Sequence, residues 1–149
     1  MEELSKLDIC AVSNLISTRE VSAVEVTQIA VKRAQELQPS INAFIQLEAE
    51  EALEAAEVID NTIKNGDRVG PLAGVPLAHK DMFYRAGKVT TCGSKIRAKF
   101  KSDRTSTALD RLSRAGAVYL GGLNMSEFAV GPIGNNVHYG DCHLSLIHI

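Results

Sequence analysis

The sequence predicts an α/β fold in which helices pack on a mixed β-sheet. Stretches with helical periodicity alternate with short apolar runs along the chain, and glycine, proline and asparagine residues separate them. The chain has 149 residues, of which 45% are hydrophobic, so it is long enough and apolar enough to bury the core of about one domain.

The expected elements follow from caps, stops and periodicity. A first short helix begins after Asp8, and a second begins at a capping box formed by Ser22 and Glu25. Pro39 should stop this second helix, because proline cannot donate the next backbone hydrogen bond. Further helices are expected over residues 48–64 and 107–115. Strands are expected over residues 41–47, 72–78 and 117–120.

Charge and composition exclude several classes of protein. Sixteen basic and eighteen acidic residues give a net charge of −2, which does not indicate a nucleic-acid or membrane surface. The N-terminus lacks the pattern of a signal peptide, and no apolar run is long enough for a spanning helix. The chain has three cysteines, Cys10, Cys92 and Cys142. This is an odd number, and their spacing is not that of a disulfide framework, so we expect free thiols in the cytoplasm.

Lys80 is the strongest candidate in the sequence for acid–base chemistry. It follows an apolar run that ends at Ala78, and lysine is seldom buried without a partner. A desolvated ammonium group would have a lowered pKa and could supply a neutral amine as a base. In the alternative interpretation, the side chain extends along the strand end and its ammonium group reaches solvent.

Two motifs around Lys80 resemble the amidase signature family of serine hydrolases. Residues 70–81 read GPLAGVPLAHKD and residues 90–94 read TTCGS, which match the family's strand and the element that follows it without gaps. Residues 39–44, 114–118 and 124–129 are similar to family blocks in the same order. The resemblance covers about residues 5–143, equivalent to the N-terminal third of a typical family member. It therefore implies an incomplete amidase-signature fold.

The resemblance also implies a mechanism. In the family, a lysine deprotonates a bridging serine on a cis peptide, and that serine relays the proton from the nucleophilic serine that attacks the amide. Lys80 would be this general base, and Ser94 and Met125 resemble positions that line the site. The implied substrate is a small-molecule amide, and no cofactor, metal, membrane or direct nucleic-acid contact is implied. A homodimer or the other subunits of an amidotransferase are the implied partners.

The two catalytic serines of the family are missing from this sequence. The family places them in a glycine- and serine-rich block after the motif at residues 124–129, and residues up to Ile149 contain no such block. Residues 144–149 read LSLIHI and depart from the family pattern, so we expect a non-native tail after a 1–143 portion of one amidase domain. Three functions stay open: a fragment of an amidase that is inactive alone, a fragment of the A subunit of a tRNA-dependent amidotransferase, and an inactive remnant.

Other candidate sites have simpler explanations. The acidic cluster within residues 48–57 could bind a metal, but a solvated helical face is the expected interpretation. His138, Cys142 and His143 lack a fourth metal ligand and a supporting turn. Cys92 has no histidine placed to activate it, so an inert thiol is expected. The basic residues within 83–101 lack the glycine spacing of a phosphate-binding loop.

Overall fold

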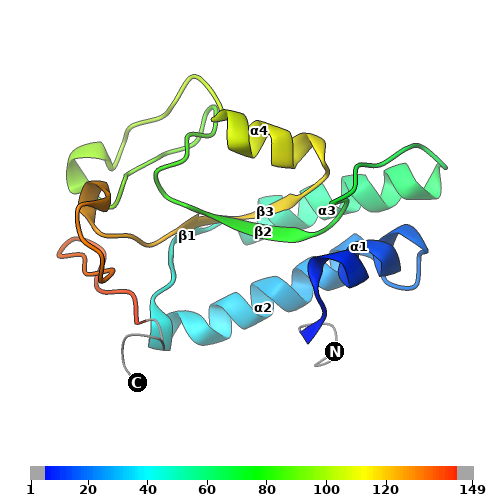
Figure 1. The fold of residues 1–149 in the computed structure, drawn as a ribbon, viewed down its shortest axis with the longest axis horizontal. Coiled ribbons are helices and arrows are strands. Elements are labelled where there is room, and N and C mark those ends of the chain that lie inside the picture. The colour runs from blue at the N-terminus through cyan, green and yellow to red at the C-terminus, as the bar shows by residue number, and fades with distance from the viewer. Residues whose placement is uncertain (1–5, 144–149) are drawn as a thin grey trace. The chain divides into compact units, whose positions relative to one another are not determined.

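The computed structural model describes residues 6–143 (Figure 1). The expected non-native tail at residues 144–149 lies outside the described residues. The helices are α1 (Ile9–Ser17), α2 (Ala23–Ile41), α3 (Ala49–Lys64) and α4 (Thr107–Arg114), with short 3-10 turns η2 (Lys95–Arg97) and η3 (Glu127–Ala129). The strands are β1 (Phe44–Leu47), β2 (Pro76–Lys80) and β3 (Val118–Leu123).

The strands form a sheet in the order β1-β3-β2. Strand β1 is antiparallel to β3, with Phe44 opposite Leu123 and Leu47 opposite Gly121. Strand β2 is parallel to β3, because Val118 donates to the Val75 carbonyl at one end and Asp81 donates to the Leu123 carbonyl at the other. The predicted class, helices with a mixed sheet, is confirmed.

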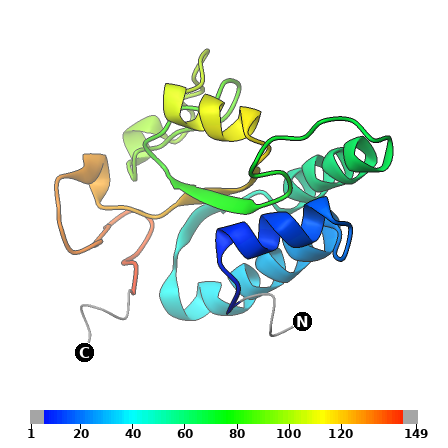
Figure 2. The same cartoon turned by 45° about the vertical axis from the view of Figure 1, so that its right-hand side comes forward.

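The described chain divides into two compact units. Unit 1 contains residues up to 34 together with 48–77 and 110–120, and unit 2 contains residues 35–47, 78–109 and those from 121 onwards. Within unit 1, α1 runs beside the first part of α2 in both views (Figures 1 and 2). The core of unit 1 includes Ile16, Ala56 and Val118, which are almost fully buried.

Small residues allow close contact in unit 1. A Cβ atom at Gly74 would lie 2.6 Å from the Ala23 side chain, so only glycine fits there without a shift.

The predicted capping box is confirmed, since the Ser22 backbone N–H donates to Glu25 and the Glu25 backbone N–H donates to the Ser22 hydroxyl. Asp60 of α3 adds a second cap, because its carboxylate accepts from the Ala23 N–H at 2.7 Å.

Several expected boundaries are wrong, and the strand expected over residues 41–47 begins only at Phe44. Helix α2 continues through Pro39 to Ile41, because proline removes only one bond so close to the helix end, and the Asn42 N–H still donates to the Gln38 carbonyl. The left-handed φ of Asn42 (48°) then turns the chain into β1. The strand expected over residues 72–78 instead begins at Pro76, because residues 71–74 form turns that Gly74 (φ 76°) permits.

Unit 2 is built mostly from loops that pair with one another. Residues 86–102 close on themselves through isolated bridges between Ala86 and Ser102 and between Val89 and Lys101. A Cβ atom at Gly121 would lie 2.0 Å from the Gln46 carbonyl oxygen, so β1 and the end of β3 require glycine for their close approach. Little of unit 2 is regular secondary structure, so side-chain hydrogen bonds fix the geometry of its candidate site.

Candidate functional site

Lys80 is the last residue of β2, and its side chain is exposed. The chain turns sharply after it, because the Lys80 carbonyl accepts hydrogen bonds from the N–H groups of both Met82 and Phe83. Among the residues that the structure describes, its ammonium group has no hydrogen-bond or ion-pair partner. In this chain the side chain thus reaches solvent, as the alternative interpretation expected, and the role of general base stays a prediction.

Asp81, the next residue, is in the opposite environment. Its side chain is only 2% exposed, and its carboxylate accepts hydrogen bonds from the backbone N–H (3.0 Å) and the hydroxyl of Thr91. Burial raises the pKa of the Asp81 carboxyl above its usual range, although the hydrogen bonds from Thr91 act in the opposite direction. The buried carboxyl group therefore fastens the end of β2 to the loop at residues 90–94.

The loop at residues 90–94 has an unusual backbone. Cys92 (φ 53°) and Gly93 (φ 70°) are consecutive left-handed residues, and such a pair turns the chain tightly. The Cys92 N–H donates to the Asp81 carbonyl, and the Cys92 carbonyl accepts from the Phe128 N–H. Cys92 is buried, and burial raises the pKa of its thiol, which favours the inert thiol that was expected.

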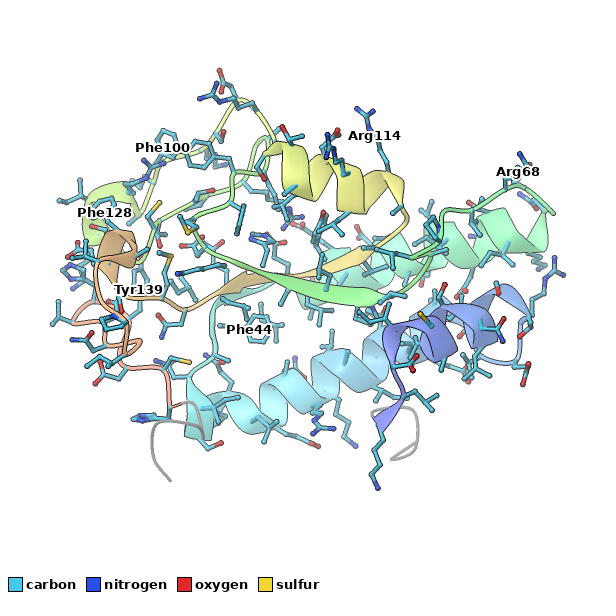
Figure 3. The ribbon with its side chains drawn as sticks, viewed as in Figure 1. Phe44, Arg68, Phe100, Arg114, Phe128 and Tyr139 are labelled. Atoms are coloured by element: carbon cyan, nitrogen blue, oxygen red, sulfur yellow. The ribbon has the colours of Figure 1, made fainter. Side chains whose placement is uncertain are left out.

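Asn136 holds this loop in place. Its side chain is 3% exposed, and its amide NH2 donates to the backbone carbonyls of Gly93 (2.8 Å) and Met125 (2.7 Å). Its carbonyl oxygen accepts from the backbone N–H groups of His138 (2.8 Å) and Tyr139 (3.0 Å), and Figure 3 labels Tyr139. One amide side chain thus links three segments of unit 2 through four hydrogen bonds.

Ser94 lies in a polar cluster with Glu127 and His138. The buried Ser94 hydroxyl donates to Glu127 Oε1 at 2.5 Å, and His138 Nε2 lies 3.1 Å from the same oxygen. The hydrogen bond from Ser94 is the main cause that lowers the pKa of Glu127, and His138 adds to it. Glu127 lies between the serine and the histidine, so the order of a Ser-His-acid triad, in which the histidine contacts the serine, is not met.

Asn42 and Asn124 fix the final described segment. Asn124 donates to the carbonyls of Asn42 (3.1 Å) and Gly140 (3.0 Å), and Asn42 donates to the Tyr139 carbonyl at 2.9 Å. Many of the side-chain hydrogen bonds described in unit 2 therefore involve residues 136–143 or the loop at 90–94.

The structure brings some of the predicted site residues together. Ser94 and Met125 are both buried and both border Gly93, since a Cβ atom there would lie 2.8 Å from the Met125 carbonyl oxygen. Sequence reasoning missed Asn136 and the burial of Asp81, because an isolated asparagine or aspartate carries no periodic signal. The asparagine pair at 135–136, directly after Gly134, is the one local hint of a structured turn.

A metal site does not form from the described residues. Within residues 6–143, no group of three or more histidine, cysteine, aspartate and glutamate side chains is placed to bind an ion. All three cysteines are unpaired. No helix in the described part of the chain is both long and apolar enough to cross a membrane.

Known proteins share sequence and fold with this chain. The family model described as Amidase matches residues 25–144. The chain is 47% identical over 125 residues to the A subunit of glutamyl-tRNA(Gln) amidotransferase from Azoarcus sp. (strain BH72), covering 84% of this chain and 26% of the relative. It is 41% identical over 140 residues to the protein of the same name from Acidothermus cellulolyticus, covering 94% of this chain and 28% of that protein.

Solved structures agree with the sequence comparison. A structure of a vestigial protein complex that bears on the evolutionary origins of an s-triazine catabolic enzyme matches with a TM-score of 0.86 at 36% identity, over 90% of this chain and 30% of that one. Fatty acid amide hydrolase matches with a TM-score of 0.89 at 25% identity, over 94% and 25%. The chain belongs to the amidase family, and it spans about a quarter of the length of the curated relatives it matches.

Proposed function

We propose that residues 1–143 are part of a single amidase domain that hydrolyses C–N amide bonds, with Lys80 as its general base. The observation that carries the proposal is the position of Lys80 at the end of β2, directly before the buried Asp81 and inside the region that matches the family. A base must be held in place to be effective, and the contacts of Asp81 with Thr91 fix the backbone next to Lys80.

In the proposed reaction, the neutral amine of Lys80 accepts the proton of a bridging serine. The bridging serine takes the proton of a nucleophilic serine, whose oxygen attacks the amide carbonyl. The C–N bond then breaks, the leaving nitrogen takes the proton held by Lys80 through the bridging serine, and an acyl-serine remains. Water then hydrolyses the acyl-serine and restores both serines. The block that supplies these serines in the family is not part of this sequence, so we expect no turnover from the 149-residue chain alone.

The A subunit of a tRNA-dependent amidotransferase is the second candidate function. The curated relatives carry that name, which favours a glutaminase that works with companion subunits. A free amidase would instead act alone or as a homodimer on a small amide. Both candidates act in the cytoplasm without direct nucleic-acid contact, need no cofactor or metal, and share Lys80. An inactive remnant is the outcome if the coding sequence holds no serine block.

The first test is to sequence the source DNA beyond the codon for His143. A frame that continues into a glycine- and serine-rich block supports the proposal and identifies residues 144–149 as a non-native tail. A stop codon directly after Ile149 contradicts the catalytic proposal, because Lys80 would then have no serine to activate.

The second test measures the role of Lys80 directly. Residues 1–143 would be joined to the remaining segment of the Azoarcus relative, and ammonia release from glutamine and from small amides would be measured. We expect Lys80→Met to lower kcat by roughly 10²–10⁴-fold, the usual contribution of general-base catalysis. Lys64→Met, an exposed lysine of α3, is the matched control and should leave kcat unchanged. A kcat of the Lys80→Met protein close to that of the unmodified fusion, or measurable turnover by the pure 149-residue chain, would refute the corresponding claim.

A further inference from the structure

Residues 84–104 of unit 2, here called the basic loop, gather positive charge in a chain that is acidic elsewhere. The basic loop contains seven lysine and arginine residues and one carboxylate, Asp103. The remainder of the chain has nine basic and seventeen acidic residues. Such segregation creates a local positive potential that a chain of net charge −2 would not otherwise have.

Four cations of the basic loop lie at its surface without an ion pair to the described residues. The side chains of Lys95, Lys99, Lys101 and Arg104 are exposed. Among the described residues, none of these four has an ion-pair partner. Like charges held close together repel, so a partner that brings carboxylates to this surface would relieve the repulsion and gain attraction.

Contacts of Arg97 cross-link the basic loop, and a cross-linked loop loses less conformational entropy on binding. The Arg97 guanidinium lies 3.8 Å from the centre of the Phe100 ring and 5.3 Å from that of Tyr84, and Figure 3 labels Phe100. Arg97 also donates to the Thr90 carbonyl and to the Tyr84 hydroxyl. Arg97 therefore serves to hold the loop closed, while its neighbours present their charges to solvent.

An exposed apolar residue lies among these charges. Ile96 is 86% exposed in the turn η2, directly after Lys95. Lys99 follows three residues later, just beyond the end of η2. Phe100 is also exposed, at 39%. An exposed apolar residue with charged neighbours in the sequence is consistent with a small protein interface, which has an apolar centre and a polar rim.

We propose that the basic loop is a docking surface for an acidic protein segment that carries an apolar residue to cover Ile96. RNA fits the surface less well, because base stacking needs an open aromatic face and the guanidinium of Arg97 occupies one face of the Phe100 ring. This inference is independent of the amidase reaction.

The test compares three fluorescein-labelled probes by anisotropy, using the 149-residue chain. The probes are a 12-residue peptide of glutamates with two leucines, the same peptide with serines in place of the leucines, and a 12-nucleotide single-stranded RNA. We expect the leucine peptide to bind with a Kd about tenfold lower than either other probe. Equal binding of the two peptides, tighter binding of the RNA, or no binding at low salt would each overturn the proposal.

Exposed substitutions locate the binding surface. The pair Lys95→Glu and Lys99→Glu should weaken binding of the leucine peptide by about tenfold or more, and Ile96→Ser should remove its advantage over the serine peptide. The pair Lys64→Glu and Arg68→Glu makes the same charge change at exposed positions of unit 1 and should weaken binding much less. An equal effect of the two pairs would show that net charge alone attracts the peptide, and would overturn the proposal. So would loss of binding when residues 1–143 are joined to the rest of a relative, because another segment would then cover the loop.

Discussion

Replacing Asn136 by alanine should release the loop at residues 90–94. The variant removes the two hydrogen bonds to the buried carbonyls of Gly93 and Met125 and the two from the N–H groups of His138 and Tyr139. Each hydrogen bond contributes about 1 kcal/mol net, and water can replace part of the loss at the half-buried His138 and Tyr139. We therefore expect the free energy of opening of this loop to fall by about 3 kcal/mol.

Hydrogen exchange measured by mass spectrometry detects this opening. The amides of Gly93 and Ser94 bond to Thr91 and not to Asn136, so their exchange reports the loop and not the deleted bonds. If the amides exchange only when the loop is open, a fall of about 3 kcal/mol in the free energy of opening makes their exchange about a hundredfold faster.

The matched control for this measurement is Asn135→Ala. Asn135 is exposed and has no side-chain hydrogen bond to the described residues, so exchange in the loop should stay within about twofold of the unmodified chain. Unchanged exchange in the Asn136→Ala variant, or equal changes in both variants, would refute the idea that Asn136 holds the loop.

Two further substitutions test the same part of the chain. Asp81 has a raised pKa in the folded state, so its contribution to stability is fully present below the unfolded pKa of about 4 and is lost as the pH rises towards the folded pKa. Urea unfolding of Asp81→Asn and of the unmodified chain would be followed by far-UV circular dichroism. The urea midpoint of the variant should rise relative to that of the unmodified chain as the pH increases from 4 to 7. A difference between the two midpoints that stays constant with pH would contradict the burial argument. Gly93→Ala should cost about 2–4 kcal/mol, because it combines a left-handed residue with a Cβ atom 2.7 Å from Asn136 Nδ2. Equal urea midpoints for Gly93→Ala and the unmodified chain would show that the loop relaxes.

The sequence predicted the elements whose signals are local. The capping box at Ser22 and Glu25 and the helix that ends at Lys64 are confirmed, because caps and periodicity act over a few residues. The expected stop at Pro39 is wrong, because a proline near a helix end removes little that the helix needs.

The site was harder to predict, since its contacts are distant in sequence. The motif at residues 70–81 pointed to Lys80, but nothing in that motif shows that the carboxyl group beside it is buried. Asn136 lies 43 residues from Gly93 and 11 from Met125, so no local pattern relates them. The segment around Asn136 has little regular structure, and without alternation or helical spacing there is no period from which to infer which side chains face inwards.

The contrast between Lys80 and Asp81 determines how a catalytic assay must be interpreted. Successive residues at a strand end point to opposite sides, so the chain exposes the amine and buries the carboxyl in adjacent positions. The carboxyl group contacts Thr91 and the backbone of the loop, and it makes no hydrogen bond to the Lys80 ammonium group. An effect of Asp81→Asn on amide hydrolysis should therefore arise from displacement of the strand end. It should appear as a lower kcat with the pH of half-maximal activity unchanged, whereas direct participation of Asp81 in proton transfer would move that pH.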